Sequence, residues 1–177
     1  IDGLLIVTPY YNKPSQEGMF LHYSEIAEAS PVPIILYNVP SRTGVNLEAQ
    51  TVIRLAGKYE KIVAVKEASG IISQISLISK YAPDHFSVIS GDDVLALPII
   101  AVGGTGVISV VANALPEKLS RLIHLALEGK YNKARMLHYE MVDLIKLLFK
   151  EGNPGGIKAL LHIQGKIEHQ LRTPLYR

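Results

Sequence analysis

The segment Ile62-Val63-Ala64-Val65-Lys66-Glu67-Ala68-Ser69-Gly70 shows the plan that the whole chain repeats. An apolar run of four residues ends directly at a lysine and a carboxylate, and a turn follows. A short apolar run between polar boundaries is typical of a strand that is buried on both faces of a parallel sheet. The segment therefore predicts a strand at residues 62–65 that carries Lys66 at its carboxyl end.

The same plan recurs along the chain. Further apolar runs lie at 4–7, 34–37, 86–89 and 106–110, and segments with helical spacing lie between the runs at 20–29, 47–57, 71–81 and 94–102. Strands and helices that alternate in this way indicate βαβ units, with parallel strands and right-handed crossovers. The predicted fold class is α/β.

After the fifth run the pattern becomes helical. Apolar stripes lie at 119–127 and 134–148, and a third helical segment at 157–165 follows Asn153-Pro154-Gly155-Gly156. Gly129 and Gly152 are expected to end the first two helices. We therefore expect residues 1–114 to form β/α units and residues 115–177 to form a C-terminal helical region.

Five β/α units do not close a barrel of eight, which usually needs about 250 residues. An open doubly wound sheet is the alternative, and it predicts a Gly-rich phosphate turn followed by an acidic residue about 20 positions later. The sequence contains no such pair of features. We therefore expect the C-terminal part of a (β/α)8 TIM barrel, from about its fourth strand to its eighth, with C-terminal helices. A first residue other than Met agrees with a longer parent chain.

Composition narrows the function. The 18 basic and 16 acidic residues are dispersed along the chain, so no basic surface for nucleic acid is expected. No apolar run has the roughly 18 to 20 residues of a membrane helix. The chain has no cysteine, which excludes disulfides and thiolate metal sites and favours a cytoplasmic protein.

Polar and aromatic residues follow the predicted strands at 8–12, 37–44, 66–70 and 90–93. Parallel strands place these ends on one rim, where barrel enzymes build their sites. Lys66 would have its stem among apolar side chains, and desolvation there favours the neutral amine that attacks a carbonyl. Tyr37 would lie beside it if their strands are neighbours, and a phenol can relay protons. The alternatives are a lysine whose ammonium reaches water and an ordinary amphipathic tyrosine.

Other candidates surround this pair. Arg42 lies in a turn between Pro40 and Gly44, where its planar fork suits a carboxylate, although a solvated loop arginine has the same pattern. The turn at 103–106, Gly-Gly-Thr-Gly, can bind phosphate or simply allow close packing. The six histidines share no ligand spacing and Asp92-Asp93 is typical of a helix cap, so no metal is expected.

Residues 37–44, Tyr-Asn-Val-Pro-Ser-Arg-Thr-Gly, resemble the signature segment of the dihydrodipicolinate synthase family in the N-acetylneuraminate lyase superfamily. Segments 8–18, 66–68, 90–93 and 103–109 resemble further family segments in the same order. The resemblance covers essentially the whole chain. It implies a Schiff-base lyase that condenses pyruvate with aspartate 4-semialdehyde to 4-hydroxy-tetrahydrodipicolinate, in lysine and diaminopimelate biosynthesis.

The resemblance also implies roles for individual residues. Lys66 would form the Schiff base with pyruvate and Tyr37 would relay protons. Tyr11 would cross from a neighbouring subunit to complete a hydroxyl chain, which implies a homo-oligomer, expected as a dimer of dimers. Arg42 would hold the carboxylate of the semialdehyde. No cofactor is implied, because the lysine itself provides the electron sink.

Three more residues, Thr43, Gly91 and Ile108, would line the pocket through backbone or packing contacts. The family's Gly-Thr-Thr-Gly-Glu segment, which holds the pyruvate carboxylate, does not occur in this sequence. We therefore expect that these 177 residues alone are inactive. Only Tyr10 matches the family's lysine-feedback site, so regulation stays open.

Three other functions are compatible with parts of the sequence. An N-acetylneuraminate lyase or a 2-keto-3-deoxy sugar-acid aldolase would share the lysine and the tyrosine, but its polyhydroxylated partner needs neutral groups where Arg42 stands. A non-catalytic barrel scaffold has no use for a desolvated amine beside a phenol. A phosphate-binding isomerase would rest on the glycine turn alone.

Overall fold

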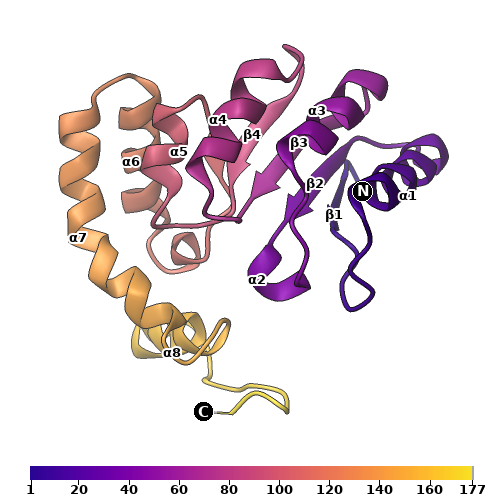
Figure 1. The fold of residues 1–177 in the computed structure, drawn as a ribbon. Coiled ribbons are helices and arrows are strands. Elements are labelled where there is room, and N and C mark those ends of the chain that lie inside the picture. Colours follow the sequence, from indigo (N-terminus) through magenta and orange to yellow (C-terminus); the bar gives the residue numbers. More distant parts are fainter. Residues whose placement is uncertain (177) are drawn as a thin grey trace. The chain divides into compact units, whose positions relative to one another are not determined.

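The computed structural model describes residues 1–176, which form two compact units (Figure 1). The first unit is Ile1–Ile108 and the second begins at Ser109. All the residues that the sequence assigns to the active site lie in the first unit. The division of the chain into a barrel part, residues 1–114, and a C-terminal helical region, residues 115–177, stays a prediction.

The first unit contains a five-stranded parallel sheet in the order β1-β2-β3-β4-β5. The strands are β1 (Leu4–Val7), β2 (Ile34–Asn38), β3 (Ile62–Glu67), β4 (Ser87–Ser90) and β5 (Gly106–Val107). The order follows the sequence without a reversal, as neighbouring strands of a β/α barrel do. Each predicted strand is present, but the fifth is shorter than the predicted segment 106–110.

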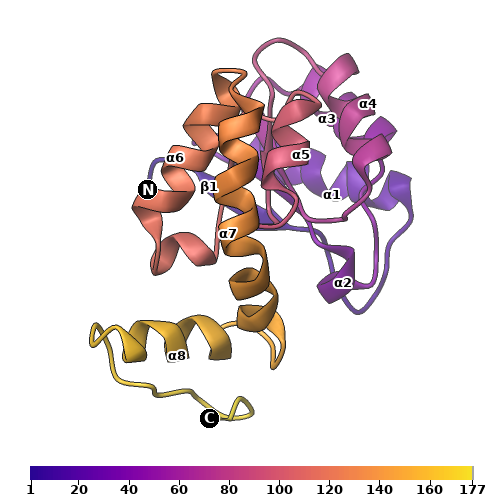
Figure 2. The ribbon, with the colours of Figure 1, turned by 90° about the vertical axis from the view of Figure 1, so that its left-hand side faces the viewer.

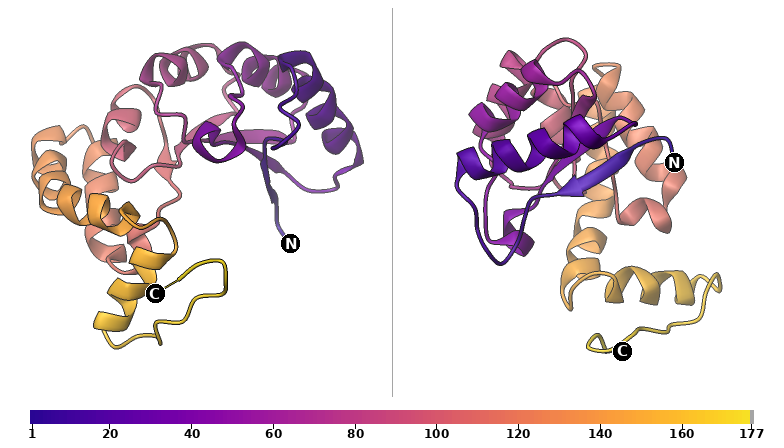
Figure 3. Two further views of the ribbon diagram at one scale, coloured as in Figure 1. Left: turned by 60° about the horizontal axis from the view of Figure 1, so that its bottom comes forward. Right: turned by 90° about the vertical axis from the view of Figure 1, so that its right-hand side faces the viewer.

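Five helices accompany these strands: α1 (Gln16–Ala29), α2 (Pro40–Thr43), α3 (Ala49–Lys58), α4 (Ile72–Tyr81) and α5 (Ala96–Ala101). Helices α1, α3, α4 and α5 lie in a row along one side of the sheet (Figure 3), while the short α2 lies beyond the carboxyl end of β2 (Figure 1). The hydroxyl of Ser15 accepts a hydrogen bond from the amide of Gly18 at 3.2 Å and so caps the start of α1. Helix α2 begins at Pro40 and ends at Gly44, which has a left-handed φ of 73°.

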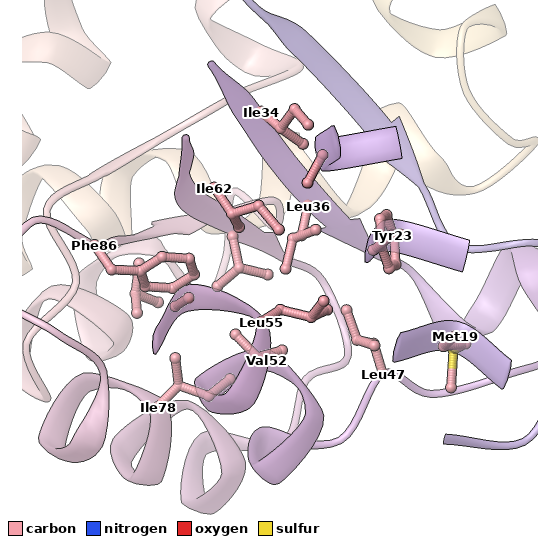
Figure 4. Close-up of a cluster of buried hydrophobic side chains, with 14 of the residues drawn as sticks. Met19, Tyr23, Ile34, Leu36, Leu47, Val52, Leu55, Ile62, Ile78 and Phe86 are labelled. Carbon is pink, nitrogen blue, oxygen red and sulfur yellow. The ribbon is translucent and has the colours of Figure 1, made fainter. Parts of the chain in front are cut away.

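The core of this unit lies between the sheet and these helices (Figure 4). Alternate strand residues such as Leu36 and Ile62 point toward Leu55 of α3 and Ile78 of α4, and all four are fully buried. The other sheet face is only partly buried at Tyr37 and its neighbours. The helices of the unit pack against the opposite side, so in the described residues the burial predicted for both faces is complete on the helix side alone.

The pairing of β2 with β3 contains one irregularity. Ile34 pairs with Ile62, but Ile35 pairs with Ala64, so the register shifts by one residue. From that point the pairing is regular as far as Asn38 and Glu67. The shift determines which residues meet at the carboxyl ends of the two strands.

The second unit is helical, with η1 (Val111–Asn113), α6 (Pro116–Leu127), α7 (Tyr131–Phe149) and α8 (Gly155–Ile163). Helices α6 and α7 pack side by side (Figure 2). Gly129 connects them with a φ of 74°, which confirms the predicted stop. Among residues 1–176, no helix combines the length and the apolar character needed to cross a membrane.

Candidate active site

Lys66 and Tyr37 meet at the carboxyl edge of the sheet. They are register partners on the adjacent strands β3 and β2, so both side chains leave the same face. The Lys66 Nζ lies 4.1 Å from the centroid of the Tyr37 ring. The proximity expected from the sequence is therefore present, and it follows directly from the shifted register.

The surroundings of Lys66 make loss of its proton easier than it is in water. Partial burial lowers the pKa of the Lys66 amine, and the negative charge of Asp93 opposes this shift. A free amine at the mouth of a barrel is the form that attacks a carbonyl carbon.

The position of the Tyr37 phenol further stabilises its protonated form. Partial burial raises the pKa of Tyr37, and the nearby positive charge of Arg42 acts in the opposite direction. A neutral phenol beside an amine can both donate and accept a proton, as a relay requires.

Arg42 is presented by the short helix α2, directly after β2. The backbone amide of Arg42 donates to the Val39 carbonyl at 2.9 Å, and Gly44 closes the turn. The Arg42 side chain is exposed, and no acidic group in residues 1–176 pairs with it. Its guanidinium is thus available to an external carboxylate on the side of the site where Tyr37 lies.

Thr43 contributes to the turn and not to the open site. Its residue is 5% exposed, and its hydroxyl lies 3.2 Å from the Val39 carbonyl and 3.0 Å from the Val45 carbonyl. A hydroxyl has one proton, which these two acceptors share. The expected role of Thr43 as a lining residue is therefore restricted to its backbone and its packing.

Gly91 touches the stem of Lys66. A Cβ atom added to Gly91 would lie 3.1 Å from both Cγ and Cε of Lys66, and 2.9 Å from Cβ of Ala68. The Gly91 amide also donates to the Glu67 carbonyl at 2.7 Å. The glycine at this position thus allows the lysine stem to lie flat against the β4–α5 connection.

The two remaining predicted residues lie at the margins of this group. The Ile108 amide donates to the Ser90 carbonyl at 2.9 Å, which places Ile108 at the carboxyl end of β5. Tyr11 is 90% exposed and has a φ of 68°, which is unusual for a residue other than glycine. No contact between Tyr11 and the Lys66–Tyr37 pair is present in the described residues.

A buried polar network lies on the opposite face of the same strand ends, and it was not predicted from the sequence. Asn38 and Glu67, which directly follow Tyr37 and Lys66, are buried and joined by a hydrogen bond of 2.6 Å. A signal for it exists, because alternation along a strand must turn the residue after Tyr37 or Lys66 toward the helices. Its other members come from distant segments and could not be read from spacing.

In the described part of the chain, no three His, Asp or Glu side chains form a group that could hold a metal ion. The functional groups at the rim are an amine, a phenol and a guanidinium. Parallel β/α units that place such groups at their strand ends are the arrangement of a (β/α)8-barrel protein, with its site at the carboxyl face of the sheet.

The chain belongs to the dihydrodipicolinate synthetase family, whose profile matches residues 1–177. It is 51% identical over 175 residues to the 4-hydroxy-tetrahydrodipicolinate synthase of Phocaeicola vulgatus, and 52% identical over 175 residues to that of Parabacteroides distasonis. Each comparison covers 99% of this chain and 59% of the relative. The chain thus spans about three-fifths of the length of these curated relatives.

Solved structures agree with this assignment. The dihydrodipicolinate synthase from Aquifex aeolicus is 46% identical and superimposes with a TM-score of 0.96, covering 99% of this chain and 60% of that structure. The Thermotoga maritima synthase is 42% identical, with a TM-score of 0.95 and coverage of 99% and 60%. The fold is therefore part of a (β/α)8 barrel, and the open doubly wound sheet is excluded.

Proposed function

We propose that the protein containing this chain is a Schiff-base lyase that condenses pyruvate with aspartate 4-semialdehyde, giving 4-hydroxy-tetrahydrodipicolinate. The observation that carries this proposal is the 4.1 Å approach of the Lys66 Nζ to the Tyr37 ring at paired strand ends. Its relatives in Phocaeicola vulgatus and Parabacteroides distasonis bear the name of that synthase.

The chemistry begins at the neutral Lys66 amine. The amine adds to the ketone carbon of pyruvate to give a carbinolamine, which loses water to form an iminium ion. The iminium nitrogen then accepts the electron pair that remains when a proton leaves the pyruvate methyl group, and an enamine results. Tyr37 lies where a phenol can carry protons to and from the carbinolamine oxygen.

The enamine carbon adds to the aldehyde of the second substrate and forms the new carbon–carbon bond. The amino group of that substrate then attacks the iminium carbon, which closes the ring and releases the Lys66 amine. Arg42 binds the carboxylate of the semialdehyde, because its guanidinium is exposed and unpaired in the described residues. A bidentate arginine–carboxylate pair fixes both the position and the orientation of a small substrate.

We propose that the active form is a homo-oligomer, expected as a dimer of dimers, and that it is cytoplasmic. Tyr11 supports an assembly, because its side chain is 90% exposed. Burial of such an aromatic side chain against a partner subunit would stabilise the assembly. A relative described as the first monomeric dihydrodipicolinate synthase variant shows that this fold also occurs without partners. Sedimentation velocity of the natural protein distinguishes these states.

The substrate assignment is tested with Arg42→Ala in the intact natural protein. Removal of the guanidinium is expected to raise the KM for aspartate semialdehyde strongly, by about 100-fold for a lost charged pair of about 3 kcal/mol. The KM for pyruvate is expected to change little. Equal effects on both substrates, or faster turnover with a polyhydroxylated aldehyde, would contradict the assignment.

A further inference from the structure

The residues directly after Tyr37 and Lys66 form a buried pair behind the proposed active site. Asn38 and Glu67 are register partners, one position beyond the pairing of Tyr37 with Lys66. Since side chains alternate along a strand, this pair points to the helix-covered face of the sheet. Asn38 is 1% exposed and Glu67 is 0% exposed.

The Glu67 carboxylate accepts hydrogen bonds from three side chains. The amide nitrogen of Asn38 donates to Oε1 at 2.6 Å, while the Ser69 hydroxyl at 2.8 Å and the Gln74 amide at 3.3 Å donate to Oε2. Burial raises the pKa of Glu67, and these hydrogen bonds oppose the rise. A buried carboxylate without such partners is strongly destabilising, so the fold depends on keeping them in place.

Asn38 links the Glu67 carboxylate to the segment that connects β2 with α3. Its Oδ1 accepts from the Leu47 amide at 2.9 Å, and its Nδ2 also donates to Oδ1 of Asn46 at 2.8 Å. Asn46 in turn donates to Gln74 of α4 at 2.8 Å. The pair is therefore fixed from both the β2–α3 and the β3–α4 sides.

The pairing of β2 and β3 needs a device of this kind. The shift between Ile34 and Ile35 shows that two registers are used along one pair of strands. If the initial register continued, Tyr37 would face Val65, and Lys66 would face Asn38. A slip of one residue also turns every side chain to the other face, so Glu67 would lose its donors.

We propose that Asn38 and Glu67 form a register lock: a hydrogen-bonded pair that holds the ends of β2 and β3 in the one pairing that places Tyr37 beside Lys66. Both are positioning residues, since they act through their neighbours on the opposite face of the sheet. The expected effect on the rate of imine formation rests on the proposed function. The expected effect on the contact between Tyr37 and Lys66 does not depend on the proposed function.

The test compares Glu67→Ala and Glu67→Gln in the intact natural protein, using the rate at which pyruvate is trapped on Lys66 by borohydride, per mole of folded protein. A misplacement of the amine by about 1 Å lowers this rate by about 100-fold, and this loss is expected for Glu67→Ala. Glu67→Gln keeps the shape and an acceptor for Asn38, and is expected to recover most of the rate.

The matched control is Leu55→Ala, which removes a fully buried side chain of α3 from the same core and leaves the lock intact. It is expected to lower stability and to leave the trapping rate of the folded fraction unchanged. A loss of rate as large as that of Glu67→Ala would show a general effect of stability and would overturn the lock.

A crystal structure of Glu67→Ala, or of Asn38→Ala if Glu67→Ala does not fold, provides the readout that needs no activity. The expected result is a separation between the Lys66 Nζ and the Tyr37 ring that is longer than 4.1 Å in the alanine variant, and close to 4.1 Å in Glu67→Gln. An unchanged contact in the alanine variant would overturn the proposal. A wild-type protein that forms no adduct would refute the Schiff-base function instead, and the crystallographic comparison would still decide the lock.

Discussion

Replacement of Gly91 by alanine tests how tightly the site holds its lysine. The added Cβ would lie 3.1 Å from Cγ and Cε of Lys66 and 2.9 Å from Cβ of Ala68, where ordinary contacts begin at 3.4 Å. The shortfall is about 0.3 Å toward the lysine and about 0.5 Å toward Ala68, on the steep repulsive side of the van der Waals curve. Ala68 has no flexible end that can move away, so part of the strain falls on the backbone beneath Lys66.

Two consequences follow from this crowding. Overpacking costs about 1 to 3 kcal/mol of stability. A shift of the amine by about half an ångström lowers the rate of imine formation by about tenfold, if a shift of 1 Å costs about 100-fold. The assay is the initial rate of borohydride trapping with pyruvate, corrected for the folded fraction from urea unfolding.

Gly57→Ala is the control for this experiment. Its added Cβ meets no atom within 4 Å, and Gly57 lies inside α3. A helical Gly→Ala change there raises stability by about 0.5 to 1 kcal/mol, without an effect on trapping. If Gly91→Ala traps pyruvate at the wild-type rate, the contact does not position Lys66 and the reasoning fails.

Two further predictions concern the amine and the core. Because burial lowers the pKa of Lys66 below the usual 10.5, the neutral amine persists to lower pH; the trapping rate should rise with pH and level off with an inflection below 10.5, whereas an inflection at or above that value would contradict a desolvated amine. Leu55→Ala should lower the free energy of unfolding by about 2 to 5 kcal/mol, measured by urea denaturation, because a fully buried leucine leaves a cavity; a loss below about 1 kcal/mol would show that α3 packs loosely on the sheet.

The local sequence predicted the strands well where a run of apolar side chains coincides with a buried segment of the sheet. Residues 4–7 form β1 as predicted, and the run that ends at Lys66 forms β3. The fifth strand is the exception, because Val110 has helical backbone angles of −84° and −48° and leads into η1. Its β-branched side chain favours a strand, so the local preference at this position is overridden by the turn that follows.

The short helix α2 was predicted only as a turn. Pro40 at its start and Gly44 at its end are the usual signals of helix boundaries, but four residues are too few for helical periodicity to show. The consequence for the site is small, because a turn and a single helical turn both present Arg42 beyond the end of β2.

The active-site pair and the register lock differ in how far sequence reasoning reaches them. Lys66 and Tyr37 each close an apolar run, so their meeting follows once the two strands are neighbours. The lock requires Gln74, which reaches Glu67, and Asn46, which reaches Asn38 and Gln74; both approach only after α3 and α4 have packed on the sheet. The one-residue shift in β2–β3 pairing likewise has no local signal, because neither glycine nor proline marks the residues around Ile62 and Val63 where it occurs.

The most direct test of the Schiff-base mechanism is to incubate the intact natural protein with pyruvate and borohydride, and to locate the adduct by peptide mass spectrometry. The mechanism predicts a single reduced pyruvate adduct on Lys66, which disappears in Lys66→Arg because a guanidinium remains protonated and is not a nucleophile. An adduct on a different lysine, or no adduct on a folded protein, would contradict it.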